Sequence, residues 1–337
     1  MRYLGVDLHT NSFTVCYLTD TGRERIKEYR MKDLKEFKRG LKRTDSVAVE
    51  ATGNTRYFVD EVCQLVKQVV VVDPSKFEII KSSINKTDEN DARNLAFFMS
   101  KDMLPKARLK TKERAQISSL VGTRDKLVKL RTTLINKIHN ILNHHGIKSK
   151  KEAYSSNKGL ERVLKMKFDE IVLVELEVLV DQIRSLNEGI KRLDEQIKDS
   201  GCKMAGHKNL TSIKGIGDKS ATVLLSVIGD VNDFNDKDKL ASYFGIVPRV
   251  SNSNETQHHG RITKRGSKIG RTTLVQCTLI AIRYSSYLRN YYNRIKNRRG
   301  SGKAIIATAR KLLGIIYETL KNKWVFDDFP NFVIAKS

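Results

Sequence analysis

The sequence lacks several features that mark well-known protein classes. It has no apolar run long enough to cross a bilayer, and its first residues alternate like a β-strand instead of forming a cleavable leader. Four cysteines, at positions 16, 63, 202 and 277, show no CxxC spacing. This spacing disfavours a zinc site or a disulfide framework and predicts reduced, mostly buried thiols. Together these absences predict a cytoplasmic protein with no membrane association.

Acidic residues are also scarce relative to bases. The 337 residues include 63 Lys plus Arg and 38 Asp plus Glu, which gives a formal net charge of +25. Such a surplus predicts a polyanionic partner, either nucleic acid or, less often, an anionic membrane face. With 39% hydrophobic residues the chain is globular rather than disordered, and its length suits two or three domains.

The shortage of acid is most pronounced near the C-terminus, where residues 256–317 contain neither Asp nor Glu. A charge run is ordinarily a solvated face, but self-repulsion in so long a window destabilises a fold unless phosphates neutralise it. We therefore predict a nucleic-acid-binding surface whose affinity falls steeply with salt. Its bases are Arg261, Lys264, Arg265, Lys268, Arg271, Arg283, Arg289, Arg294, Lys296, Arg298, Arg299, Lys303, Arg310 and Lys311, interleaved with Tyr284, Tyr287, Tyr291 and Tyr292.

Residues 1–105 predict an α/β domain. Three β-rich runs at 3–8, 12–18 and 23–31 precede a short amphipathic helix at 33–42. A fourth strand at 46–51, a helix at 55–66 and a fifth strand at 68–73 follow. A three-strand meander followed by alternating helices and strands is the order of the ribonuclease H-like fold.

Residues 106–200 predict a helical region. From Leu176 to Ile197 the apolar positions are spaced alternately by three and four, which is a heptad seam, and an earlier helix covers about 113–142. The two helices suit an antiparallel hairpin within one chain or a pairing between chains, and residues 144–159 look like their connection.

Residues 201–337 predict a mainly helical domain. Gly215 and Gly217 form a tight turn before a helix that starts near Asp218, as in a helix-hairpin-helix element. The N–H groups at such a helix start can hold a DNA phosphate. A plain structural turn explains the same pattern.

Two carboxylates occupy predicted neighbouring strands. Asp7 lies within the first strand among apolar residues, and Glu50 ends the fourth strand. In a ribonuclease H-like sheet these strands are adjacent, so the two acids would face each other and repel unless a cation lay between them. Mg²⁺ is the natural ion, since it prefers oxygen ligands and keeps waters for substrate phosphates.

A second pair of acids, Asp88 and Asp91, precedes an apolar helical segment. Their i,i+3 spacing places them on one helix face. The simplest alternative is that they only favour a helix N-terminus through its dipole. If the helix packs beside the first strand, the four acids form one pocket for two Mg²⁺ ions, which can stabilise both oxygens of a phosphodiester exchange.

These motifs resemble the DEDD transposases of bacterial insertion sequences, here called the insertion-sequence one-ten family. The N-terminal marks are "GVDLH", "VAVEATG" and "KTDENDA", which carry the four acids. The C-terminal marks are "IKGIG", "FGIVPR" and "GRITKRGSKIGRTTLVQ". The resemblance spans nearly the whole chain.

The resemblance implies a RuvC-like domain at 1–105, a coiled-coil assembly region at 106–200 and a C-terminal transposase domain at 201–337 with a serine nucleophile. It implies Mg²⁺-dependent recombination of donor and target DNA, directed by a structured bridge RNA from the element. The expected assembly is a homo-oligomer, dimer to tetramer, in which the acids of one subunit work with the serine of another.

The family serine lies between "GxxP" and "GxIxK", a window in which both Ser251 and Ser253 fall. Ser253 has the family spacing from Pro248 and to Gly260, although Asn254 replaces the usual glycine. Ser253 is therefore the predicted nucleophile, with Ser251 as the alternative. The bases at 261, 264, 265, 268 and 271 are candidates to hold phosphates near the break.

Two other functions suit parts of the same pattern. A RuvC-like nuclease or junction resolvase would use water and need no serine. A non-catalytic nucleic-acid-binding protein would use its acids only at helix starts. A nuclease or resolvase would nick DNA in a metal-dependent reaction without a covalent protein–DNA intermediate. A non-catalytic binder would not be stabilised by Mg²⁺.

Overall fold

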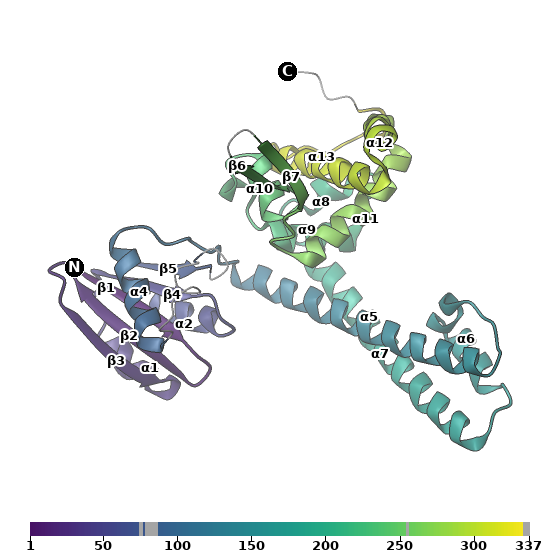
Figure 1. Cartoon of the computed structure of the whole chain (residues 1–337), viewed down its shortest axis with the longest axis horizontal. Coiled ribbons are helices and arrows are strands. Elements are labelled where there is room, and N and C mark those ends of the chain that lie inside the picture. Colours follow the sequence, from purple (N-terminus) through teal and green to yellow (C-terminus); the bar gives the residue numbers. More distant parts are fainter. Residues whose placement is uncertain (74–76, 78–86, 254–255, 333–337) are drawn as a thin grey trace. The chain divides into compact units, whose positions relative to one another are not determined.

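The computed structural model describes residues 1–73, 77, 87–253 and 256–332, and for 251–253 and 256–259 it describes the backbone alone. The chain divides into two compact units, Met1–Leu109 and Lys110–Ser337 (Figure 1). The first is a mixed α/β unit and the second is mostly helical, so the predicted fold classes of both parts are confirmed. No helix within the described ranges combines the length and apolarity that crossing a bilayer requires.

The first unit is built on a five-stranded sheet. Its elements are β1 (Arg2–Leu8), β2 (Ser12–Thr19), β3 (Glu24–Arg30), α1 (Leu34–Arg39), β4 (Asp45–Glu50), α2 (Thr55–Val62), β5 (Gln68–Val72) and α4 (Asp88–Ser100). The strand order is β3-β2-β1-β4-β5. The first three strands pair antiparallel, whereas β4 runs parallel to both β1 and β5. All five strands form where the β-rich runs predict them.

Alternation along β1 separates the two faces of this sheet. Leu4, Val6 and Leu8 join an aromatic cluster around Phe13 and Phe58, packed with α1 and α2. The opposite face is covered by α4, whose Leu95, Ala92 and Ala96 join apolar groups of β2, β4 and β5. Successive side chains of a strand point to opposite faces, so residues at odd positions of β1 face α4.

The second unit begins with a long helical hairpin made of α5 (Lys112–His144) and α7 (Glu170–Cys202). The α7 seam is confirmed, because Leu176, Ile183, Ile190 and Ile197 are buried. Arg124 pairs with Asp194 at 2.9 Å, and Arg131 Nη1 donates to Asn187 Oδ1 at 2.9 Å. These pairs run antiparallel, so the two helices pair within one chain.

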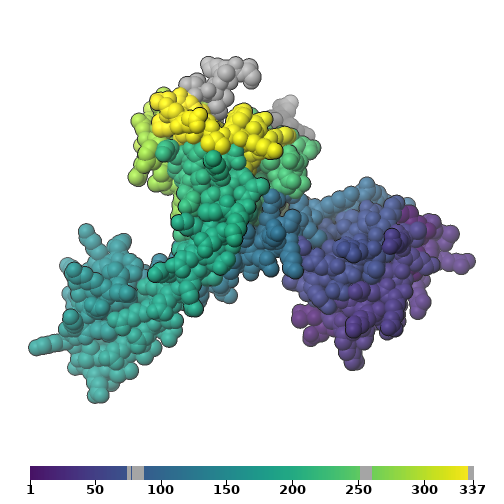
Figure 2. Space-filling view, turned by 180° about the vertical axis from the view of Figure 1, so that it is seen from behind, coloured from purple at the N-terminus to yellow at the C-terminus, as the bar shows by residue number. Residues whose placement is uncertain are grey.

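The far end of the hairpin is more than a simple connection. A 3₁₀ turn (Lys151–Ser155) and the short helix α6 (Asn157–Leu164) lie between the long helices. Their Tyr154, Leu160 and Val163 are buried against the hairpin. The stretch looks polar in the sequence because these buried residues are separated by many polar ones. In Figure 2 the teal hairpin extends as a rod from the green and yellow bundle of the same unit.

The rest of the second unit is a helical bundle with one added β-hairpin. Its elements are α8 (His207–Thr211), α9 (Asp218–Ile228), α10 (Lys237–Tyr243), β6 (Pro248–Ser253), β7 (Thr256–Ile262), α11 (Lys268–Tyr284), α12 (Ser286–Arg299) and α13 (Ser301–Lys321). Buried aliphatic residues of α9, α11 and α13 form its core. Helix α9 also contacts both α5 and α7, which joins the hairpin to the bundle.

Candidate functional site

The acidic site is positioned by a close approach of α4 to β1 at Gly5. A Cβ atom on this glycine would lie 2.0 Å from the Ala92 carbonyl oxygen and 2.4 Å from the Ala96 nitrogen. Only a residue without a side chain permits that contact with helix backbone. Gly5 and Asp7 share one strand face, so the first turn of α4 is brought toward the Asp7 carboxylate.

His9 joins this site and was not predicted from the sequence. Its Nε2 lies 3.3 Å from Asp7 Oδ2 and 3.2 Å from Asp88 Oδ2. One ligand atom from each of the three residues lies within 4.8 Å of the other two. The sequence signal was present, because His9 follows Asp7 by two residues and an extended chain places such residues on one face.

The electrostatics of Asp7 suit a cation. Burial raises the pKa of its carboxyl, His9 opposes that rise, and the charges of Asp88 and Asp91 add to it. Burial together with two neighbouring acids therefore destabilises the ionised form of Asp7 when no cation is present. Carboxylate oxygens and an imidazole nitrogen are metal ligands, so these residues fit a divalent ion.

The other two predicted acids lie on the predicted elements. Asp91 is buried in the first turn of α4, 5% exposed. Glu50 ends β4, where Val49 is registered opposite Val6, and its carbonyl oxygen accepts a hydrogen bond of 2.7 Å from Thr55 Oγ1. Among the described residues of this unit, the ligand atoms that lie within 4.8 Å of one another belong to Asp7, His9 and Asp88. Neither Glu50 nor Asp91 is part of that group.

The predicted nucleophile lies on a strand. Ser251 and Ser253 belong to β6, and their backbones are registered with His258 and Thr256 of β7. Asn254 lies outside the described residues. The polar sequence hides this hairpin because a two-stranded ribbon is held by backbone hydrogen bonds and needs no apolar alternation.

The predicted phosphate-binding bases differ in their surroundings. Arg261, Lys264, Arg265 and Lys268 are exposed. Arg271 is half-buried and has a structural role. Its Nη1 donates hydrogen bonds to the backbone carbonyls of Phe244 at 3.1 Å and Gly266 at 3.2 Å. Burial lowers the pKa of its guanidinium. The first four are therefore more accessible to phosphate than Arg271.

The two glycines before α9 have different roles. Gly215 has a φ of +110°, and a Cβ there would lie 2.7 Å from the Ala281 nitrogen, so it packs directly against α11. Gly217 precedes the first residue of α9 and has open space around its Cα. The tight turn and the helix start near Asp218 are confirmed.

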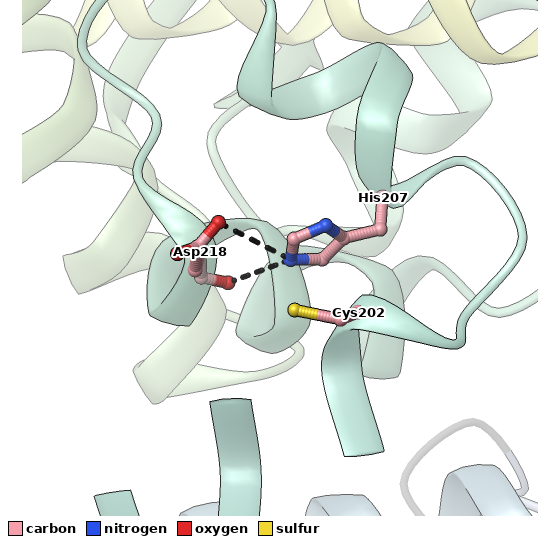
Figure 3. A group of neighbouring side chains, drawn as sticks. All are labelled: Cys202, His207 and Asp218. Carbon is pink, nitrogen blue, oxygen red and sulfur yellow. Dashed lines mark hydrogen bonds and ion pairs between the residues drawn. The ribbon is translucent and has the colours of Figure 1, made fainter. Parts of the chain in front are cut away.

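A second cluster brings together Cys202, His207 and Asp218 (Figure 3). His207 is buried, and its Nε2 lies 3.3 Å from the Asp218 carbonyl oxygen and 3.9 Å from Asp218 Oδ1. A carbonyl oxygen only accepts, so Nε2 carries the hydrogen and donates it. This bond fixes α8 to the start of α9. Two of the four cysteines, Cys63 and Cys202, are exposed, which corrects the expectation of mostly buried thiols.

We expect unequal effects from substitutions in this second cluster. His207→Ala removes a buried ring and its hydrogen bond and should lower stability by about 1–3 kcal/mol. Cys202→Ser should change stability by less than about 0.5 kcal/mol, as is usual for exposed positions. Urea unfolding with EDTA and with Zn²⁺ measures both. A zinc-dependent stabilisation that Cys202→Ser abolishes would contradict a purely structural role.

Comparison with known proteins gives a consistent result along the chain. Residues 4–147 match the DEDD transposase family of IS110 type, and residues 207–293 match the family described as "Transposase IS116/IS110/IS902 family". The chain is 25% identical to the transposase for insertion sequence element IS1111A of Coxiella burnetii, over 95% of this chain and 90% of that one.

Two further relatives cover most of the chain. A probable family 20 transposase of Pseudomonas aeruginosa is 26% identical over 82% of this chain and 84% of its own length. The pilin gene-inverting protein of Moraxella lacunata is 26% identical over 96% and 97% respectively. With both family matches in the expected order, the chain belongs to the IS110 family of DEDD transposases, which are DNA-transposing enzymes.

Proposed function

We propose that this transposase is an Mg²⁺-dependent serine recombinase of an insertion sequence, directed by a bridge RNA encoded by the element. In this proposal Asp7, Glu50, Asp88 and Asp91 hold the metal and Ser253 attacks DNA. Donor and target DNA, the RNA and further copies of the chain, from dimer to tetramer, are its partners. The acid-free basic window supports the nucleic-acid partners.

The observation that carries the proposal is the convergence of Asp7, His9 and Asp88 at one end of β1. Strand order β3-β2-β1-β4-β5, with β4 parallel to β1, supports a ribonuclease H-like, RuvC-like assignment for this unit. Oxygen ligands on β1, β4 and α4 suit Mg²⁺, which is bound through carboxylates and retains waters.

The proposed chemistry is a phosphoryl exchange. A bound divalent ion would polarise the scissile phosphate and lower the pKa of the attacking hydroxyl. The Ser253 oxygen forms a bond to phosphorus as the bond to the 3′-oxygen breaks, and the serine proton leaves while the 3′-oxygen takes one up. A 3′-OH of the exchanged strand then attacks the phosphoserine and restores the serine. No energy cofactor is consumed.

The names of two relatives support a reaction that rejoins DNA ends over one that only hydrolyses them. The Moraxella proteins are named as pilin gene-inverting proteins, and inversion of a DNA segment needs every cut end to be joined again. A covalent intermediate preserves the phosphodiester energy for that step. The accessible bases at 261, 264, 265 and 268, with the N–H groups near Gly217, are proposed to hold phosphates.

The test is the capture of protein covalently attached to DNA. Labelled element-end DNA, the element's RNA and Mg²⁺ are incubated with the protein and resolved on a denaturing gel. Wild type and Ser251→Ala should form the adduct, and Ser253→Ala should not. Ser251→Ala is a matched control because it removes another serine hydroxyl, two residues away on the same strand.

The remaining outcomes assign other functions. Adduct formation by Ser253→Ala but not by Ser251→Ala would move the nucleophile to Ser251. Completed cleavage by both variants without an adduct would indicate a water-using nuclease or resolvase. A protein that binds DNA but neither cleaves it nor gains stability from Mg²⁺ would be a non-catalytic binder.

A further inference from the structure

A large open cleft lies in the second unit, beside the basic window. Its volume is about 1300 Å³, and its walls come from α12, α13, the base of the β6–β7 hairpin and the segment after α13. Pro248, Gly260 and Ile262 contribute from the hairpin. This is the same hairpin that carries Ser253, so the cleft opens next to the strand with the proposed nucleophile.

The cleft combines an apolar and aromatic lining with a basic one. Apolar and aromatic groups include Ile295, Ile306, Ile315, Tyr287, Tyr291 and Trp324. The lining also holds the bases Lys237, Arg261, Arg298, Arg299, Lys303, Arg310 and Lys311 against the acids Asp238 and Glu318. Asp238 is already paired with Arg310 at 3.0 Å. The cleft therefore keeps a strong positive charge over an apolar floor.

The aromatic rings are held in place before any ligand arrives. Lys311 Nζ lies 4.6 Å from the ring centroids of both Tyr287 and Tyr291, and Arg294 lies 5.3 Å from the centroid of Tyr291. Such cation–π contacts fix the rings. The backbone of Trp324 is held by a hydrogen bond from its N–H to the Thr319 carbonyl at 2.9 Å, and the residue is 49% exposed.

This lining discriminates between forms of nucleic acid. A duplex presents phosphates outward and keeps its bases stacked inside, so it would leave the apolar floor unused. An unpaired strand offers phosphates to the bases at the rim and flat base faces to the rings. An uncharged apolar peptide would match the floor but not the positive rim.

We propose that this cleft binds a stretch of unpaired DNA next to the strand break, with bases stacked on Tyr291 and Trp324 and phosphates on Arg298, Arg299 and Lys303. The choice of DNA rests on the proposed function of Ser253. That residue lies five positions along β6 from Pro248, or about 16 Å at the usual strand rise, which is roughly five stacked nucleotides.

Trp324 is the single tryptophan of the chain, so its fluorescence reports directly on the cleft. A twelve-nucleotide single strand should quench this emission, and the same sequence as a duplex should not. An abasic strand with the same phosphates should bind at least about tenfold more weakly, because stacking contributes about 1–3 kcal/mol per base. Equal binding of abasic and normal strands would overturn the proposal.

Substitutions separate stacking from charge. The double variant Tyr291→Leu/Trp324→Ala should bind a single strand about tenfold or more weakly, measured by the fluorescence anisotropy of a labelled strand. The slope of its log affinity against log salt concentration should be unchanged. Arg298→Gln with Arg299→Gln should lower the slope by about 1.4, at about 0.7 per phosphate contact. Tyr57→Leu and Arg43→Gln are matched controls at exposed positions outside both the cleft and the basic window, and they should leave single-strand binding unchanged.

Further arms test the occupant. If single-stranded RNA binds tenfold more tightly than DNA, the cleft is an RNA site and the proposal is overturned. If the chains self-associate without nucleic acid and this buries Trp324, the cleft is a protein interface and the proposal is also overturned. Ser253→Ala should bind single strands as wild type does. Single-strand preference without any covalent adduct would support the cleft while refuting the serine chemistry, and the reverse result would refute the cleft alone.

Discussion

Asp7→Asn is expected to make the metal-free protein more stable while it abolishes strand cleavage. The buried carboxylate has Asp88 and Asp91 nearby, and this site raises its pKa. An amide of the same size removes the unfavourable charge, so the free energy of unfolding in EDTA should rise by about 1 kcal/mol, a few degrees in melting temperature. Cleavage should fall at least about a hundredfold, since even residues that only support metal ligands have effects of up to that size.

Two measurements test this expectation. Mg²⁺ should raise the melting temperature of wild type and leave that of Asp7→Asn unchanged. The control is Asp45→Asn, which weakens the buried bidentate contact with Arg2 (2.9 and 2.6 Å) and should cost about 2 kcal/mol. This variant should keep its response to Mg²⁺. An equal Mg²⁺ response in wild type and Asp7→Asn would rule out Asp7 as a ligand.

The pH dependence has a definite sign. Because the pKa of Asp7 is raised on folding, the metal-free folded state holds this proton more tightly than the unfolded chain does. That contribution to stability is complete below the ordinary carboxyl pKa and is lost as pH rises through the raised value. The stability advantage of Asp7→Asn in EDTA should therefore grow from acid toward neutral pH and then level off.

Gly5→Ala is expected to be the most damaging single-methyl change in the first unit. The added carbon would lie 2.0 Å and 2.4 Å from backbone atoms of α4, so no side chain can move to make room. The helix must shift, and we expect a loss of about 3 kcal/mol or more, at the upper end for overpacking. The shift also moves Asp88 and Asp91 away from Asp7, so the Mg²⁺ response should fall.

Gly53→Ala is the matched control, because a Cβ at that position meets no atom within 4 Å. It should change stability by less than about 0.5 kcal/mol and keep the Mg²⁺ response. Urea unfolding of the three proteins, with and without Mg²⁺, gives both quantities. If Gly5→Ala and Gly53→Ala were equally stable, the close approach of α4 to β1 would not be what positions the acids.

The sequence predicts most of the first unit because local pattern and tertiary structure agree there. The strand around Asp7 has apolar residues at alternate positions, Leu4, Val6 and Leu8, and Asp88 begins a helix with an N-cap at Thr87. His9 was missed because its role depends on the distance between β1 and α4. That distance is set by Gly5, a residue whose importance lies in the contact it permits and not in any periodic pattern.

Features of the second unit that depend on contacts between distant residues are harder to predict from the sequence. The α7 seam is periodic and was predicted, whereas β6 and β7 are polar ribbons without apolar alternation. Cys202, His207 and Asp218 converge only because α8 folds back onto the start of α9. The lining of the cleft combines residues of the basic window with Trp324, which lies outside that window. The distribution of charge along the sequence therefore could not predict the cleft.

The intrachain pairing of α5 and α7 has a consequence for handling the protein. Both halves of the rod are covalently linked, so its folding is unimolecular and dilution does not melt it. In the proposed homo-oligomer, subunits could then separate and exchange between assemblies while each chain stays folded. Mixing two differently tagged preparations should yield hybrid particles without a denaturation step.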